Sequence, residues 1–539
     1  MELSSQTKEL IEKYDLWRRS QKPKEGTATI HVDEVASKVA VFYENIRTII
    51  DWKEEHLIRR SAIIRKLKRR FLDLELNNFS LENVAENLVM ELVRGGYFPN
   101  DKIPESKIAD VQRIIEKYIF LLKNSPENKK GKTGLQFYTK LLEVAACEIE
   151  ETLAPSLKEI ALIEFMFSVM RERITVSESI YGRNLLKKED TDIQIYVAVQ
   201  QSLFKLDNPI ISYNLIKYKY PYWDNPSQDE LLKISQNIYK ILQRIERDIT
   251  HPLSKKFYTI CEKYDTPYLL LGDVIAENEP EKVNQELQEP VRVEEMVRRA
   301  YLRRLADLKA KITRAAIYYT ASIFITKILT LLLLEFVIIR ILFNTQLDLF
   351  ALLLDIVIPT GLMALLVISA KKPSRKNLNM VVMETVKIVY PQEKTDMYEV
   401  KLAKKRSVGT RLFLSFMYLA GAAASFGLIF FIFSALNLPL TSIIINFIFI
   451  ALILFAGTAI QMRSQELTIE DEKNGVLEFV SDIFFLPIAD TGRWLSNTWK
   501  QYNAIAAFFN ALIDMPFSAF IEFLEGWRFF IKEKKEEMR

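Results

Sequence analysis

Cysteine is almost absent from this chain, and the two that occur, Cys147 and Cys261, both lie in helical patterns. Two dispersed cysteines favour a reducing cytoplasmic setting over a disulfide framework, and neither is placed like a nucleophile. Histidine is equally scarce: His31, His56 and His251 are far apart and have no carboxylate or cysteine partner at ligand spacing. The sequence therefore predicts no metal site, no histidine-based triad and no cofactor.

Other familiar signals are missing as well. The first 20 residues alternate in charge and lack the apolar core of about 7 to 15 residues that a signal peptide needs. Gly131, Lys132 and Thr133 imitate the end of a phosphate-binding loop, but Pro126 stands where the first glycine should be. The net charge of +4 is small for 539 residues, so no nucleic-acid partner is expected.

The chain does have four long apolar runs in its second half, at 315–343, 347–370, 412–436 and 443–460. Each run is close to the roughly 20 residues that a helix needs to cross a bilayer core. The runs form two close pairs. The first pair, together with the basic helix that precedes it, covers 298–370, and the second pair covers 412–462. The sequence therefore predicts a polytopic membrane domain of four helices, arranged as two helical hairpins.

Apolar residues recur at helical spacing through the first half, which predicts an all-α cytoplasmic domain over 1–275. The expected helices cover 35–72, 81–93, 108–122, 137–153, 157–170 and 193–206. Ser227 and Glu230 have the spacing of a capping box and begin a further helix, which continues to the break at His251 and Pro252. The Glu-rich segment 276–297 then resembles a solvated linker.

Lys and Arg gather before the first run, between the two pairs and after the fourth run. By the positive-inside rule, both termini and the loop 371–411 are expected on the cytoplasmic side of a plasma or inner membrane. Two alternating segments in this loop, 385–390 and 397–402, predict a small β-hairpin. The last part, 463–539, predicts amphipathic helices on the inner surface of the membrane, or packed against the soluble helices instead.

Ionisable residues within the apolar runs are the sharpest chemical clue, because each is unfavourable in a bilayer unless it is paired, protonated or near an interface. Lys327 and Arg340 are placed to reach an interface as anchors. Glu335 and Asp355 each lie ten residues from the first turn, which places both about 15 Å deep on opposite arms of one hairpin. Two facing carboxylates would raise one pKa, as in a proton or cation site.

Two further residues extend this candidate ion or proton site. Pro359 and Thr360 follow Asp355 by one turn and predict a helix break that frees backbone carbonyls. The competing interpretation is that Glu335 and Asp355 are protonated or hydrogen-bonded residues that hold helices together, and that the proline is a simple kink. Both interpretations remain open at the level of the sequence.

Basic and aromatic residues at the ends of the apolar runs are the expected lipid-surface contacts. They are Arg303, Arg304, Lys371, Lys372, Lys404, Lys405, Arg406 and Trp527. The basic run 59–70 is either a solvated helix face or a second contact with the membrane surface. The stretch 213–223 interleaves lysine with aromatic residues, which is typical of a helix end that seals the core and also of a base-stacking platform.

Together these patterns favour an integral membrane protein that presents a helical cytoplasmic domain and acts as a scaffold, without catalytic activity. Its expected partners are the bilayer with its anionic lipid headgroups, a protein partner and further copies of the chain. The alternative is an oligomeric channel or transporter with a carboxylate pair at the membrane midplane. A third and weaker alternative is a membrane-bound enzyme whose site lies in the helical domain.

Overall fold

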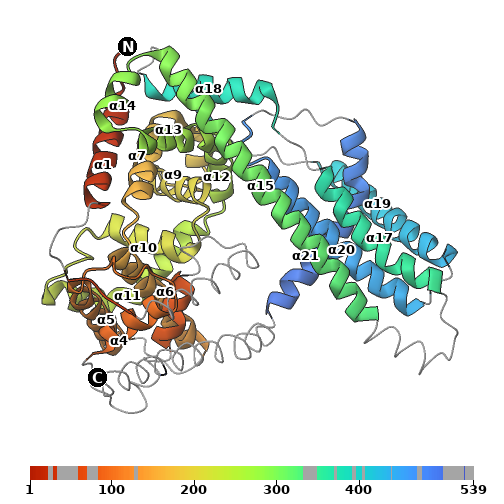
Figure 1. Ribbon diagram of the computed structural model, residues 1–539, viewed down its shortest axis with the longest axis horizontal. Helices are drawn as coiled ribbons and strands as arrows, with labels where there is room; N and C mark the ends of the chain where they lie inside the picture. The colour runs from red at the N-terminus through yellow and green to blue at the C-terminus, as the bar shows by residue number, and fades with distance from the viewer. Residues whose placement is uncertain are drawn as a thin grey trace, which may run out of the picture. The chain divides into compact units, whose positions relative to one another are not determined.

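The structure is a computed structural model, and it is mostly helical (Figure 1). It describes residues 1–21, 28–32, 59–68, 83–126, 132–331, 349–369, 373–390, 396–402, 407–436, 438, 440–469, 476–501 and 527. The helical fold class predicted from the sequence is confirmed.

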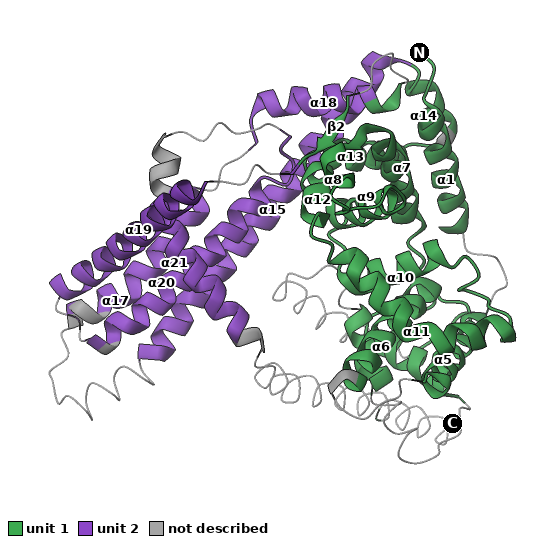
Figure 2. Cartoon of the chain, turned by 180° about the vertical axis from the view of Figure 1, so that it is seen from behind, with its two compact units in different colours: residues 1–288, 388–401, 508–539 green, residues 289–387, 402–507 purple. Residues whose placement is uncertain are grey.

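The chain divides into two compact units, which Figure 2 colours separately. Unit 1 comprises 1–288, 388–401 and 508–539, and unit 2 comprises 289–387 and 402–507. The segment 388–401 thus belongs to unit 1 although it lies in the sequence between two stretches of unit 2. The chain therefore passes between the units more than once.

Unit 1 is built from helices of up to 22 residues with buried Leu, Ile, Val and Tyr side chains. Its helices are α1 Ser5–Gln21, α4 Val84–Arg94, α5 Ser106–Asn124, α6 Lys132–Leu153, α7 Leu157–Arg173, α8 Glu178–Tyr181, α9 Lys188–Leu203, α10 Asn208–Lys219, α11 Gln228–Ile249, α12 Ser254–Lys263, α13 Asp265–Glu277 and α14 Pro280–Glu286. Helix α7 packs between α1 and α9, and α9 also packs against α12. Helix α5 packs against α4, α6 and α11.

The helices expected at 81–93, 108–122, 137–153, 157–170 and 193–206 are all present, with ends that differ by a few residues. Most of the expected helix 35–72 lies outside the described residues, and its described part, 59–68, is helical. Three cations of the basic run, Arg59, Arg60 and Lys66, pair with Glu150, Asp207 and Glu91 inside unit 1.

Helix α11 shows how directly local sequence determines an element. The Ser227 hydroxyl accepts a hydrogen bond from the Glu230 backbone N–H at 3.4 Å, and the Glu230 carboxylate accepts from the Ser227 backbone N–H at 2.8 Å. This reciprocal pair satisfies two helical donors that would otherwise lack partners. The capping box predicted from the sequence is confirmed.

The predicted β-hairpin between the two apolar pairs is wrong. Residues 385–390 lie mostly in helix α18, Arg375–Val389, where Val381 and Val389 are buried. Strand β2, Tyr398–Val400, pairs in parallel with β1, Ile174–Val176, which follows α7. Alternating side chains suit a strand, but only the tertiary fold selects its partner.

Unit 2 is a bundle of longer helices, which are α15 Pro290–Thr330, α17 Leu349–Ile368, most of α18, α19 Val408–Ala435, α20 Leu440–Ser464 and α21 Val476–Gln501. Helix α17 packs between α15 and α20, and α21 packs against both α19 and α20. Gly421 of α19 closely approaches Ile483 of α21, so a side chain at Gly421 would meet the Ile483 backbone. The absence of a side chain at Gly421 therefore allows α19 and α21 to pack closely at this point.

A buried asparagine ties three parts of unit 2 together. The Asn377 amide of α18 donates to the Tyr301 hydroxyl of α15 at 3.0 Å and to the Leu467 carbonyl at 2.7 Å. Its carbonyl oxygen accepts from the Ile469 backbone N–H at 2.8 Å. These bonds pair the backbone of the segment that follows α20.

Within the described part of the chain, α19 and the stretch Ser442–Ser464 of α20 are long and apolar enough to span a membrane. Helix α17 contains a shorter apolar stretch, Leu353–Ile368. Only the beginning of the first apolar run is described, and it continues α15 without a break as far as Thr330.

Two other expectations need correction. The segment 276–297 is not solvated throughout, because α14 and the start of α15 occupy much of it and bury Val283, Leu287 and Val293. Glutamates lie between these apolar residues in the sequence, so the overall composition of the segment does not indicate burial. Helix α21 is not a purely interfacial element, because it buries Ile488 and Ala489 in the core that α20 also lines.

Candidate functional site

The interior of unit 2 holds an ion pair between helices that are otherwise apolar. The Lys327 ammonium of α15 lies 2.8 Å from Asp355 Oδ2 of α17, and both side chains are 0% exposed. The Asn446 amide of α20 donates to Asp355 Oδ1 and to the Ser442 carbonyl. The Lys327 ammonium also lies 5.2 Å from the centre of the Phe449 ring. We call Lys327, Asp355 and Asn446 the buried ion-pair cluster.

Each member of this cluster comes from a different helix, so the cluster depends on how the three helices pack. Helix α17 continues through Pro359, which contradicts the predicted helix break. Proline lacks the backbone N–H that would bond to the Asp355 carbonyl one turn earlier. The Thr360 hydroxyl donates to the Ile356 carbonyl at 2.9 Å, a bond that often accompanies a bend in a helix.

The structure changes the roles expected for the ionisable residues. Lys327 is not an interface anchor, because its ammonium is buried against Asp355. Asp355 has a lysine as its charged partner, and this cation stabilises the ionised carboxylate, whereas a second carboxylate would repel it. Glu335 and Arg340 lie outside the described residues, so their predicted roles remain predictions.

The expected lipid-surface residues are only partly described. Arg303 is exposed and Arg304 is half-buried, both on α15. Trp527 is 53% exposed. Lys371, Lys372, Lys404, Lys405 and Arg406 lie outside the described residues. Their contact with lipid stays a prediction.

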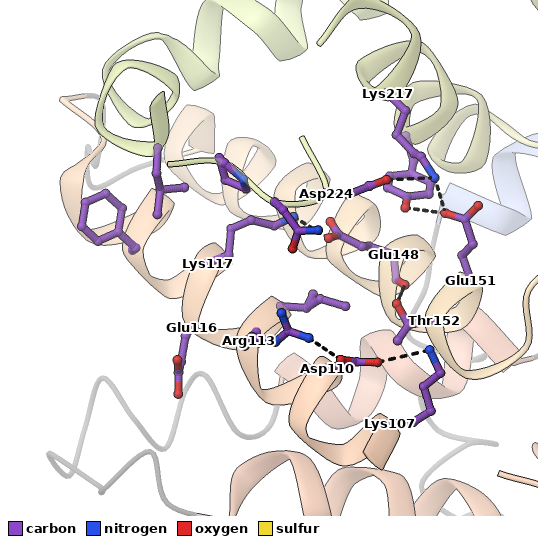
Figure 3. Close-up of a pocket in the computed structure, with 16 residues that line it drawn as sticks. Lys107, Asp110, Arg113, Glu116, Lys117, Glu148, Glu151, Thr152, Lys217 and Asp224 are labelled. Carbon is purple, nitrogen blue, oxygen red and sulfur yellow. Dashed lines mark hydrogen bonds and ion pairs between the residues drawn. The ribbon is translucent and has the colours of Figure 1, made fainter. Parts of the chain in front are cut away.

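Unit 1 contains a polar cavity of about 680 Å³, which α5, α6, α10 and the segment after α10 line (Figure 3). Glu148 of α6 is the centre of one buried network in its wall. Its carboxylate accepts from the Lys117 ammonium, from the Tyr118 hydroxyl at 2.8 Å and from the Trp223 indole N–H at 3.1 Å. Lys117 also donates to the Trp223 carbonyl at 3.0 Å.

A second network lies on the α10 side of the cavity, where Figure 3 shows Lys217 between two carboxylates. The Glu151 carboxylate accepts from Tyr213 at 2.5 Å and from Lys217 at 2.9 Å. Lys217 also lies 3.5 Å from Asp224. Tyr213 and Trp223 are buried, as expected of a helix end that seals the core, whereas Tyr218 and Tyr222 of the same stretch are exposed.

Burial dominates the electrostatics of this region. It raises the pKa of Glu148 above its usual range, while the Lys117 charge acts in the opposite direction. It likewise raises the pKa of Glu150 to about 7, although Arg59 and Arg60 partly compensate. Burial also raises the pKa of Tyr118 and of Tyr213, and neighbouring glutamates add to both shifts.

The arrangement offers little to a reacting substrate. Two of the cations that line the cavity, Lys117 and Lys217, are each paired with a carboxylate, so a charged ligand would have to compete with these pairs. Within the described ranges, no group of three or more His, Cys, Asp or Glu is arranged to hold a metal ion. The geometry is that of a structural polar network beside an open cavity.

Sequence reasoning missed both networks, although a signal existed. Lys117 stands between Ile114 and Leu121 at helical spacing, so it occupies an apolar-face position of its helix. Glu148 follows Val144 by one turn in the same way. Charged residues within apolar stripes would have predicted buried partners without identifying them.

Comparison with known proteins adds no assignment. No protein-family model matches the chain, and no curated protein or solved structure is detectably similar to it.

Proposed function

We propose that this chain is an integral membrane protein whose four apolar runs, paired as two hairpins, hold the helical domain at the cytoplasmic face of a membrane. In this proposal the helical domain binds a partner or lipid, and the chain has no catalytic activity of its own. The observation that carries the proposal is the distribution of charged and apolar side chains in unit 2. Its interior holds the buried ion-pair cluster, whereas its outer faces carry large apolar side chains.

The apolar outer face extends over several helices. Exposed apolar residues on α15, α17 and α19 are Ile317, Phe324, Ile325, Leu329, Phe350, Leu353, Leu365, Leu412, Phe413, Phe416, Leu419, Leu428 and Phe431. Soluble proteins rarely expose apolar patches of such extent. In addition, only 17% of the most apolar stretch of α19 is buried, whereas the core helix of a soluble protein is mostly buried. Hydrocarbon tails would cover these faces.

Helix lengths and charges agree with this proposal. Helix α19 has 28 residues, about 42 Å of helix, which exceeds the roughly 30 Å core of a bilayer. Cations precede the first run, and Arg463 follows the fourth near the end of α20. The positive-inside rule therefore favours cytoplasmic termini.

Binding is favoured over catalysis because the chemistry-bearing groups of unit 1 are committed to one another. Glu148 has three donors, and Glu151 has two. A reaction would need a free acid, base or nucleophile at the cavity, and neither glutamate is free in that sense.

The membrane proposal is tested by extraction and topology mapping of the full chain. We expect the protein to stay with membranes through alkaline carbonate washing. Single cysteines placed at Ser179 and at Ser407 should react with a membrane-impermeant thiol reagent from the cytoplasmic side only. The native Cys147 and Cys261 are buried and should therefore contribute little labelling of their own. Release by carbonate, or labelling of the two positions from opposite sides, would contradict the proposed arrangement.

The buried ion-pair cluster also supports a second candidate, an oligomeric channel or transporter. Ionisable residues between apolar helices commonly mark ion pathways, and Lys327 with Asp355 extends the carboxylate site first proposed for Glu335 and Asp355. The test is proton and cation flux in proteoliposomes of the wild type and of a Lys327→Met/Asp355→Leu variant. Wild-type flux that disappears in a folded double variant would favour transport, and absence of flux in both would favour the scaffold.

A further inference from the structure

Helix α11 carries a row of polar side chains along its exposed side. Lys233, Asn237, Lys240, Arg244 and Arg247 are alternately four and three residues apart, so they share one face of the helix. All five are exposed, while the opposite face of α11 is buried in unit 1. The row spans 14 helical steps, about 21 Å. We call these five residues the α11 cationic row.

Neighbouring residues balance only a small part of the positive charge of this row. None of the ion pairs between described residues includes Lys233, Lys240, Arg244 or Arg247. Glu230, which caps the start of α11 through Ser227, lies one turn before Lys233 and interacts with it electrostatically. Two further acidic residues close to the row on α11 have other partners. Glu246 pairs with Lys140, and Asp248 pairs with Lys219, each at 2.5 Å. Four adjacent cations therefore create a positive potential that attracts anions.

The row also borders a hollow in the surface of unit 1. A cavity of about 640 Å³ is lined by the row together with Tyr220 and Tyr222, and its lining contains no carboxylate. The two tyrosine rings lie 6.1 Å apart at 74° to each other. Tyr222 is 41% exposed. Cations, amides and phenol groups here all offer hydrogen-bond donors to an anion.

We propose that the α11 cationic row binds the anionic phospholipid headgroups of the membrane in which the chain is anchored. This inference rests on the proposed membrane function. A linear row of four cations fits an extended anionic surface, and such clusters on helices are typical of contacts with anionic lipid. Single-stranded nucleic acid fits less well, because edge-to-face tyrosines do not offer parallel faces to successive bases. Tyrosine is also favoured at the headgroup level of membranes.

The experiment uses the full chain with one reactive thiol. Because Cys147 and Cys261 are buried, Asn237→Cys introduces an exposed cysteine within the row that takes a fluorophore selectively. The labelled protein is reconstituted in nanodiscs of phosphatidylcholine alone or mixed with phosphatidylserine, and each includes a quencher attached to a lipid headgroup. We expect several-fold stronger quenching with phosphatidylserine and loss of that difference in high salt.

A matched pair of variants separates the row from net charge. Lys240→Gln/Arg244→Gln/Arg247→Gln should lower the ratio of docked to undocked protein roughly 100-fold. Glutamine is a good helix former and these positions are exposed, so the fold should be retained. The control, Arg171→Gln/Lys188→Gln/Lys255→Gln, removes the same charge from other exposed positions and should keep the quenching.

Several outcomes would overturn the inference. Quenching that does not depend on phosphatidylserine would overturn it, and so would equal losses in the two triple variants, which would indicate net charge alone. Displacement of the label from lipid by a single-stranded oligonucleotide, with tight binding that the row variant loses, would assign the row to nucleic acid instead. Failure of the chain to enter nanodiscs would overturn the membrane function itself, whereas entry without docking would overturn only the role of the row.

Discussion

Each unit of this protein buries a pair of a lysine and a carboxylate, and the two pairs have different surroundings. In unit 1, Lys117 and Glu148 line a cavity, and Glu148 has two further donors in Tyr118 and Trp223. In unit 2, Lys327 and Asp355 are completely buried, with Asn446 donating to the carboxylate, among helices that expose apolar side chains. The ion pair of unit 1 is thus surrounded by further polar groups and a cavity, whereas the ion pair of unit 2 is surrounded mainly by apolar helices.

This difference predicts how each pair responds when one partner is lost. A buried carboxylate beside a cavity can take up a proton or admit water, so its environment adapts. A lysine left alone between apolar helices has no adjoining cavity to admit water, and an uncompensated charge in such surroundings is strongly unfavourable. The same pair of residue types is therefore tolerant in one unit and critical in the other.

The largest expected effect separates these two cases. Asp355→Asn should destabilise unit 2 by about 3–5 kcal/mol, because it leaves the Lys327 charge without its partner. The double variant Lys327→Met/Asp355→Leu removes both charges and should be close to neutral. The measurement is unfolding of the purified full chain in detergent, followed by near-UV circular dichroism. Equal destabilisation by the single and double variants would show that the charges themselves are not the reason.

The pH dependence of unit 1 sharpens the comparison. Burial raises the pKa of Glu150 from 4.5 to about 7, so between these values the folded state holds a proton that the unfolded state has released. Stability from this group is therefore lost as the pH rises from about 4.5 to 7, by up to about 3 kcal/mol. Glu150→Gln should flatten this part of the curve of unfolding free energy against pH. Glu116→Gln, at an exposed position, should leave the curve unchanged, and a steep slope in both variants would contradict the assignment to Glu150.

A third variant tests the tolerance of the unit 1 pair. Lys117→Met should destabilise unit 1 by about 1–3 kcal/mol, less than Asp355→Asn destabilises unit 2, because Glu148 keeps its Tyr118 and Trp223 donors. The loss should be smaller at pH 5 than at pH 8, since burial already raises the pKa of Glu148 and the variant favours the protonated form further. Denaturant unfolding at the two pH values gives the comparison, with Lys117→Met/Glu148→Gln as the matched control. A loss independent of pH would contradict this explanation.

The smallest expected effect concerns the segment 388–401, which belongs to unit 1 but lies between stretches of unit 2 in the sequence. Tyr398 of β2 stacks on Tyr264 with ring centres 4.4 Å apart. Tyr398→Ala should weaken this attachment by about 0.5–1.5 kcal/mol and speed amide hydrogen exchange at 398–400. Met397→Ala, which changes an exposed neighbour, should have little effect. Equal exchange in the two variants would show that the ring stack does not hold the strand.

Local sequence patterns proved dependable where an element carries its own boundaries. Ser227 and Glu230 defined the start of α11, and the apolar spacing around Ile114 and Tyr118 defined α5. Local patterns did not predict the pairing partner of a strand where its residues could pair with more than one segment. The alternating segment that contains Tyr398 was read as half of a hairpin, although it pairs with a strand more than 200 residues earlier.

The candidate sites show the same limit. Sequence position alone identified Asp355 as an ionisable residue in an apolar helix, and it also identified Lys327. It assigned them to separate roles, since the depth of a residue along its helix does not give the direction of its side chain. Asn446 was not considered, because a single asparagine in an apolar run carries little signal without knowledge of its neighbours.

The sequence by itself determined the helical class, the capped start of α11 and the long apolar runs, because these depend on residues close together in the chain. The tertiary structure alone decided that Lys327 pairs with Asp355, that β2 pairs with β1, and that α21 packs on α19 and α20. Periodicity in the sequence shows which face of a helix is buried, but it does not show which other helix or strand packs against that face. That choice depends on packing among residues far apart in the sequence, where a buried charge or a close approach of two backbones selects one partner.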